Sequence, residues 1–211
     1  MSKVTTLFYS NMNFSIQLRY SLSLTNQLGK ILLLIMVFGF CLTSAALANE
    51  NMERRVKISL SLFPKIVAVD NGFKSKLTGE HKVRLVFVYD RNKYRADELA
   101  KELRQSNQNI ENVAVDAVSV SLDQQLQDYS VVPTAIFVAE PLGEVDFKKL
   151  VMYGIQKKVI IFSPFSGDVE RGATVGLSIT SRVFPYFNNN TLQASDLDIN
   201  PVLLEMSKRY E

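Results

Sequence analysis

The sequence predicts an α/β domain with three layers: a mostly parallel sheet, helices on both of its faces, and an antiparallel edge pair of strands near the C-terminus. Short apolar runs alternate with helical segments over residues 83–180. These runs are almost continuously apolar, as in parallel strands that are buried on both faces. Two further strand-like runs, joined by a two-residue turn, follow over residues 172–187, which predicts the antiparallel pair.

Residues 1–48 differ from the rest of the chain because they contain no Asp or Glu. Three basic residues, Lys3, Arg19 and Lys30, precede an apolar run over residues 31–42. Small residues then lead to the A-x-A sequence of residues 46–48. A basic flank, an apolar core and an A-x-A site form the pattern of a secretory signal. We expect residues 1–48 to be a cleaved signal peptide and residues 49–211 to form a single periplasmic domain.

Two features of this segment leave alternatives open. Residues 31–48 have about the minimum length for a membrane span, so an uncleaved segment would anchor the chain in the inner membrane. The stretch before it is long for the basic region of a signal, and translation from Met12 would shorten it. Cys41 follows Phe40 rather than a small residue, which argues against a lipid-attachment site.

The composition of the expected mature domain excludes several kinds of function. Three of the 24 basic residues lie in the signal, so 21 remain against 21 acidic residues. This balance gives no electrostatic case for binding nucleic acid. Cys41 is the only cysteine and leaves with the signal, which excludes disulfides and cysteine-based metal sites from the mature domain. We expect no metal and no cofactor.

The helices and strands are assigned from hydrophobic periodicity in chain order. Residues 54–69 alternate like a strand but also share one helical face, and we prefer a helix that begins near Glu53 and is disturbed at Pro64. The other expected elements are strands over 83–89, 113–120, 133–139, 158–163, 172–179 and 182–187, and helices over 95–104, 122–127, 145–155 and from Asn200–Pro201 onward.

The sequence contains no recognisable catalytic constellation. His81 is the only histidine and lies in a polar turn before the first strand, where we expect an exposed loop residue. A catalytic triad or a histidine-based metal site would need partners that the sequence does not offer. We therefore expect no catalytic residues and no enzymatic activity.

Two loops carry candidate binding residues. Asp90 follows the first strand, where α/β folds often place functional residues, although it also fits a simple turn. The loop after the fourth strand contains Ser163, Ser166 and Gly167. These residues would face a ligand at the carboxyl ends of the strands, and a plain turn is the alternative. The loop matches no phosphate-binding motif.

The expected edge strand, residues 182–187, supplies the other two candidates, Tyr186 and Phe187. An edge strand offers unpaired backbone groups, and an exposed aromatic side chain beside it would contact a partner protein or a second copy of the chain. Neighbouring residues of a strand point to opposite faces, so at most one of the two should reach solvent.

The order of features along the chain fits a known family. The expected signal is followed by an amphipathic segment (KISLSLFPKIVAVDNGFKSKL), a strand (KVRLVFVYDRN) and a helix (ADELAKELR). The last third contains a glycine-led strand at residues 172–177, a second strand ending in Asn188, then Ser195, and a helix with a Leu-Leu pair over residues 200–207. Over about residues 54–211, this order resembles the YfiR-like periplasmic proteins.

The resemblance implies a non-enzymatic regulatory protein, because studied members of that family hold an inner-membrane diguanylate cyclase inactive. The expected partner is a membrane or periplasmic protein, with self-association as the alternative. Redox control through disulfides does not carry over, because the mature domain has no cysteine. The expected domain also resembles one lobe of periplasmic solute-binding proteins. A solute-binding component of a transporter is therefore the alternative function.

Overall fold

An eight-stranded sheet with the order β2-β3-β1-β4-β5-β6-β7-β8 forms the centre of the computed structural model. The structure describes residues 50–122 and 132–211. The expected signal and residues 123–127 of the expected short helix therefore lie outside the described residues. The strands are β1 (Val83–Tyr89), β2 (Asn109–Ile110), β3 (Val113–Ser121), β4 (Ala135–Val138), β5 (Ile160–Phe162), β6 (Val175–Ile179), β7 (Val183–Asn188) and β8 (Lys208–Tyr210).

The pairing of the strands confirms the predicted mostly parallel sheet. β1 pairs in parallel with β3 and β4, and the parallel ladder continues through β5 to β6. β6 and β7 form the predicted antiparallel pair near the C-terminus. The central strands β4 and β5 are buried along their whole length, which explains why their sequences are continuously apolar.

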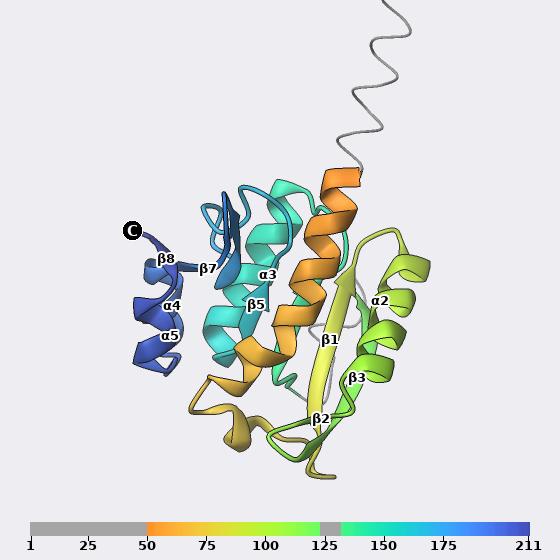
Figure 1. Cartoon of the computed structure of the whole chain (residues 1–211). Coiled ribbons are helices and arrows are strands. Elements are labelled where there is room, and N and C mark those ends of the chain that lie inside the picture. Colours follow the sequence, from red (N-terminus) through yellow and green to blue (C-terminus); the bar gives the residue numbers. More distant parts are fainter. Residues whose placement is uncertain (1–49, 123–131) are drawn as a thin grey trace, which may run out of the picture. The chain divides into compact units, whose positions relative to one another are not determined.

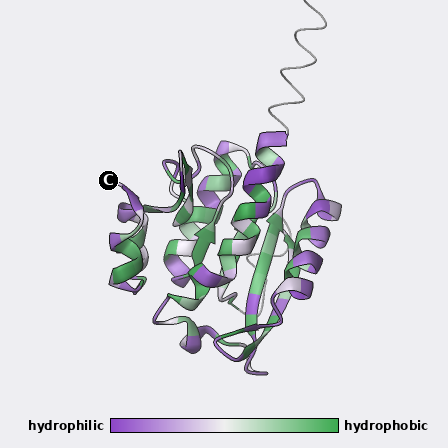
Figure 2. Ribbon diagram, viewed as in Figure 1, coloured by the Kyte–Doolittle hydropathy of each residue, from purple (hydrophilic) through white to green (hydrophobic). Residues whose placement is uncertain are grey.

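Helices cover both faces of the sheet, as the sequence predicts (Figure 1). The described helical segments are residues 50–68, η1 (Phe73–Lys76), α2 (Lys93–Ser106), α3 (Glu144–Lys157), α4 (Asn189–Ser195) and α5 (Pro201–Glu205). One core cluster joins the helix of residues 50–68 and α2 to one face, and a second joins α3 to the other. In Figure 2 the strands of the sheet are mostly hydrophobic, whereas the helices have both hydrophobic and hydrophilic residues.

The helix of residues 50–68 resolves the ambiguity between helix and strand. Val56, Leu60, Phe63 and Val67 are buried at spacings of three and four, so one helical face packs on the sheet. The Phe63 ring lies 5.3–6.2 Å from three aromatic rings of the sheet. The helix continues through Pro64 instead of ending there, and this packing compensates for the backbone hydrogen bond that proline cannot donate.

The C-terminal region differs from the prediction in two ways. The expected edge strand, β7, is not the last strand, because Tyr186–Asn188 pair in parallel with Lys208–Tyr210 of β8. The short helix α4 also separates β7 from the C-terminal helix. That helix, α5, begins as expected: the Asn200 side chain accepts the Val202 N–H at 3.0 Å.

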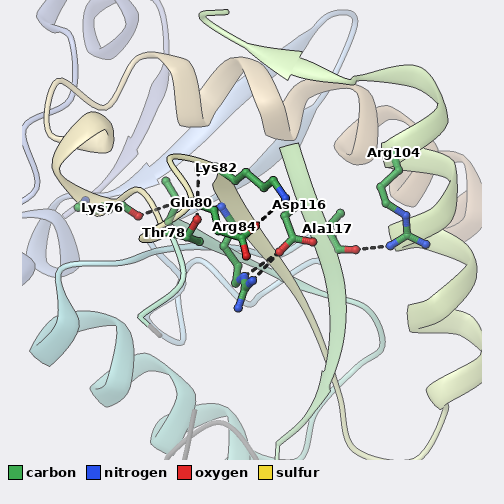
Figure 3. Close-up of polar contacts among 9 residues, drawn as sticks. Lys76, Thr78, Glu80, Lys82, Arg84, Arg104, Asp116 and Ala117 are labelled. Carbon is green, nitrogen blue, oxygen red and sulfur yellow. Dashed lines mark hydrogen bonds and ion pairs between the residues drawn. The ribbon is translucent and has the colours of Figure 1, made fainter. Parts of the chain in front are cut away.

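Polar side chains near the amino ends of the parallel strands bind one another (Figure 3). Arg84 of β1 and Asp116 of β3 lie opposite each other in register and form an ion pair at 2.7 Å. The Thr134 hydroxyl accepts the Arg84 N–H at 3.2 Å and donates to the Lys76 carbonyl at 3.0 Å. These contacts tie β1 to its neighbours.

None of the helices in the described part of the chain is long and apolar enough to cross a membrane.

Candidate ligand-binding site

The carboxyl ends of β1, β4, β5 and β6 meet at one edge of the sheet, because these strands are parallel. From β1 the chain moves outward to β3 and then returns to β4 on the other side of β1. This reversal creates a topological switch point between β1 and β4, where open α/β sheets commonly bind ligands. The same edge contains a second region, formed by the loop after β5 and the β6–β7 hairpin.

At the switch point, the Glu140 carboxylate occupies the place where a ligand anion would bind. Its Oε1 atom accepts the backbone N–H groups of Asp90, Arg91 and Asn92 at 2.7, 2.7 and 3.0 Å. Burial acts to raise the pKa of Glu140, but these three hydrogen bonds and the positive charge of Arg91 together lower the pKa below its ordinary value. The switch point is therefore filled by a side chain of the protein.

Asp90 lies at this switch point. Its carboxylate accepts the Arg91 Nε–H at 3.0 Å, and its backbone N–H donates to Glu140. The next residue but one, Asn92, caps α2 by accepting the Arg95 N–H at 3.0 Å. The structure thus separates Asp90 from the other candidate residues and gives it a place in the turn before α2.

The second region contains a cavity of about 190 Å³. It brings together three of the candidate residues, Ser166, Gly167 and Tyr186. The remaining lining comes from the helix of residues 50–68, the loop after β5, and β6: Arg55, Phe165, Val169, Glu170, Leu177, Ser178 and Ile179. Gly167 has φ +88°, and no atom lies within 4 Å of the position that a Cβ would occupy. The cavity is therefore open beside this glycine.

A buried polar network fixes the loop that forms the cavity. The Ser163 hydroxyl donates to Asp168 Oδ2 at 2.6 Å, and Arg171 Nη1 donates to Asp168 Oδ1 at 2.8 Å. Arg171 Nε donates to Glu144 at the start of α3, and the guanidinium lies 4.3 Å from the centre of the Phe147 ring. Burial raises the pKa of Asp168, against the opposing effects of Ser163 and Arg171. Ser163 thus stabilises the loop through its hydrogen bond to Asp168 and does not line the cavity.

Arg55 and Glu170 bring opposite charges to the cavity. Arg55 Nε donates to the Pro164 carbonyl and Nη2 to the Leu177 carbonyl, both at 2.9 Å. Burial lowers the pKa of Arg55 and the negative charge of Glu170 opposes this, but a guanidinium remains cationic at neutral pH. Glu170 hydrogen-bonds to the Tyr186 hydroxyl, whose pKa is raised first by burial and then by Glu170.

Tyr186 and Phe187 point to opposite sides of β7, as the strand period requires. Phe187 has an exposed fraction of 0% and belongs to the core that faces the helix of residues 50–68. Tyr186 is half-buried and lines the cavity. Of these two aromatic residues, Tyr186 is therefore the one that a ligand or partner can reach.

The sequence analysis missed Arg55, Glu170 and Glu140. The carbonyls that Arg55 binds lie 109 and 122 positions away along the chain, so no local pattern marks this residue. Glu140 has a weak signal, because it lies two residues after the end of the buried strand β4. His81 is exposed in a turn, as expected, with φ +54°. Within residues 50–122 and 132–211, no cluster of His, Cys, Asp and Glu side chains could hold a metal ion.

No protein-family model and no curated protein sequence matches this chain. Two solved structures that it matches are the ABC domain in complex with L-Trp from Streptococcus pneumoniae and a conserved domain protein from Vibrio cholerae O1 biovar El Tor. The first has 14% identity, a TM-score of 0.42, and coverage of 68% of this chain and 61% of that chain. The second has 13% identity, a TM-score of 0.47, and coverage of 67% and 60%. This chain thus spans about three fifths of each, and at these values neither likeness supports an argument about function.

Proposed function

We propose that this protein is a non-enzymatic binding domain that takes a small polar ligand in the cavity beside Gly167. The observation that carries the proposal is the presence there of a cation, Arg55, and a carboxylate, Glu170, that do not pair with each other in the described structure. Of the two functions that the sequence leaves open, this geometry favours ligand binding of the solute-binding type.

The size and lining of the cavity narrow the kind of ligand. Drug-sized ligands occupy pockets of about 300–1,000 Å³, whereas this cavity has about 190 Å³. A small metabolite fits that volume. The lining residues include hydroxyl, guanidinium and carboxylate groups but no histidine or cysteine, which favours binding over acid–base or nucleophilic chemistry.

The switch point supports the same choice of site. In open α/β sheets the crevice at the switch point is the common ligand position. Here the N–H groups that would bind an anion already donate to Glu140. Among the described residues at this edge, the N–H groups of residues 90–92 are already used, whereas the second region retains unused polar groups.

The proposal can be tested by filling the cavity. A panel of small polar metabolites is screened by thermal shift, and the binders are confirmed by isothermal titration calorimetry. Ser166→Trp places a bulky side chain on the rim and should abolish binding of any confirmed ligand. Ser75→Trp is the matched control, since Ser75 is exposed in η1, at the other end of the domain. A panel without binders, or a ligand that Ser166→Trp still binds fully, would contradict the proposal.

Regulation of a membrane signalling enzyme, as the YfiR-like resemblance implies, is the second candidate. It is favoured by Val202 of α5 and Met206, the residue directly after α5, which are 62% and 68% exposed. Exposed apolar side chains of this kind suit contact with a protein partner. If this function holds, deleting the gene should change the cellular level of cyclic di-GMP, and a Val202→Asp/Met206→Asp variant should fail to restore it. An unchanged level would exclude this candidate.

Both candidates place the protein outside the cytoplasm, and we propose that export removes residues 1–48. N-terminal sequencing of protein from the periplasmic fraction should then begin at Asn49. Full-length chain recovered in the inner membrane would instead support the anchor formed by residues 31–48.

A further inference from the structure

The two charges in the cavity have opposite signs but do not neutralise each other. Arg55 and Glu170 both line the cavity, and the negative charge of Glu170 acts on the Arg55 guanidinium. The described ion pairs nevertheless include none between them, whereas Arg171, which follows Glu170, pairs with two other carboxylates. Two unlike charges that line one small cavity without forming an ion pair can each bind a group of opposite charge.

The Arg55 side of the cavity offers donors for an anionic group. Two guanidinium N–H groups of Arg55 hold backbone carbonyls and thereby fix its position. Its Nη1 group makes no hydrogen bond to another described residue, and neither do the Ser166 hydroxyl and the Gly167 N–H. A guanidinium supported by neighbouring N–H and O–H donors suits a carboxylate.

The Glu170 side offers acceptors for a cationic group. The Glu170 carboxylate hydrogen-bonds to the Tyr186 hydroxyl, which leaves further lone pairs of its two oxygens unused. Glu170 is exposed, while Tyr186 is half-buried against the cavity. An ammonium group, which donates three hydrogen bonds, can bind here with Glu170 as its counter-charge.

We infer that the ligand is a small zwitterion of the α-amino-acid type, with its carboxylate at Arg55 and Ser166 and its ammonium at Glu170. The inference rests on the proposed function and names the chemical class of the ligand. An α-amino acid carries its two charges on one carbon, which matches a cavity of about 190 Å³ that has both charges on its walls. The same volume limits the ligand's side chain to a small one.

The ligand class can be tested with three probes of similar size. L-Alanine has both charges, propionate lacks the ammonium, and ethylamine lacks the carboxylate. Their affinities are measured by isothermal titration calorimetry at pH 7 with the mature domain. We expect L-alanine to bind at least about tenfold more tightly than either of the others, since a hydrogen bond to a charged group contributes about that factor. L-Tryptophan is the size control and should bind more weakly than L-alanine.

Two variants with matched controls assign the charges. Glu170→Gln should lower the affinity for L-alanine about tenfold, to the affinity for propionate. The affinity for propionate itself should stay the same or rise slightly. Arg55→Lys keeps the positive charge but loses the planar guanidinium group with its several N–H donors. It should lower the affinities for L-alanine and propionate by the same factor. Glu205→Gln and Arg54→Lys, both at exposed positions, should leave all affinities unchanged. Circular dichroism and thermal melts show that each variant is folded.

The outcomes separate this inference from the proposed function. If propionate or ethylamine binds as tightly as L-alanine, or if Glu170→Gln leaves the preference intact, the zwitterion inference is wrong, although the cavity still binds a ligand. If none of the three probes binds but another metabolite binds and is lost in Ser166→Trp, the ligand class is again wrong and the proposed function stands. If no small polar molecule binds at all, both fail.

Discussion

Glu140 and Glu170 lie at the same edge of the sheet and have opposite roles. Glu140 accepts three backbone N–H groups at 2.7–3.0 Å and closes the switch point between β1 and β4. Glu170 is exposed, bonds only to the Tyr186 hydroxyl among the described residues, and lines a cavity together with Arg55. The comparison teaches that a position at the carboxyl edge does not by itself identify a ligand site. What distinguishes the two regions is which polar groups the fold already uses.

The two regions also differ in how they are held. The turn at the switch point depends on one carboxylate and the start of α2. The cavity loop is fixed by Asp168 and Arg171, which bond to Ser163 directly after β5 and to Glu144 of α3. The Ser166 hydroxyl and the Gly167 N–H in this loop make no hydrogen bond to a described residue. A rigid loop with unused polar groups on one side is the arrangement expected of a preorganised binding site.

Among substitutions of charged residues, the largest expected effect comes from removing the support of the cavity loop. Arg171→Ala leaves the buried Asp168 carboxylate without its cation, and breaking such a buried pair costs about 3 kcal/mol of unfolding free energy. Chemical denaturation at pH 7 measures the loss. Arg182→Ala, at an exposed position of the β6–β7 turn, is the control and should change stability by less than about 0.5 kcal/mol. A small effect of Arg171→Ala would mean that the loop is not held by this network.

Removing the carboxylate from the switch point should have the next largest effect. Glu140→Ala deprives three N–H groups of a charged acceptor, and we expect a loss of about 2 kcal/mol. Glu140→Gln keeps an acceptor oxygen without its charge and should lose about half as much. Both are measured by urea denaturation at pH 7. If Glu140→Ala is as stable as the parent protein, the contrast between the two glutamates is wrong.

Glu140 also predicts how stability depends on pH. Its pKa is lowered in the folded protein, so the folded state binds a proton less readily than the unfolded state. The stabilisation is therefore complete above the ordinary pKa of 4.5 and is lost as the pH falls through the lowered folded value. The urea concentration at the unfolding midpoint is measured at several pH values from 7 to 3. As the pH is lowered, this midpoint should fall less steeply for Glu140→Gln than for the unsubstituted protein. Identical slopes would show that Glu140 does not contribute.

The same substitution at Glu170 should hardly affect stability. Glu170→Gln removes an exposed carboxylate that the fold does not need, and we expect a change within about 0.5 kcal/mol. The unfolding free energies of Glu170→Gln and Glu140→Gln can be compared directly under identical conditions, because both variants replace a carboxylate by an amide. A loss as large as that of Glu140→Gln would show that Glu170 is a structural residue and would weaken the case for the cavity.

The smallest effect is expected for Tyr186→Phe, which removes only the hydroxyl that bonds to Glu170. The ring stays in place, so thermal stability should be unchanged within error while ligand affinity shifts by a few-fold. Phe187→Ala is the contrasting variant on the same strand: it empties a fully buried site and should cost about 3–5 kcal/mol. Equal effects of the two variants would contradict the assignment of their faces.

The sequence by itself determined most of the fold. Nearly continuous apolar runs indicated β1, β4 and β5, and a partly alternating run indicated β3. Cap signals located α5. These patterns are local consequences of burial and backbone hydrogen bonding. It did not determine β8 or α4. Lys208–Tyr210 is a strand only because β7 is there to pair with it, and its polar sequence carries no strand signal of its own.

The candidate site was determined only in part. The sequence located the loop with Ser163, Ser166 and Gly167 because this loop follows a predicted parallel strand. It identified Tyr186 separately, as an edge-strand aromatic residue for contact with a partner. It grouped Asp90 with them, but the order of the strands places Asp90 at the switch point. Arg55 reaches the cavity from the start of a helix more than 100 positions away. Only the tertiary structure could decide this, since hydrogen bonds between distant segments leave no periodic trace in a single sequence.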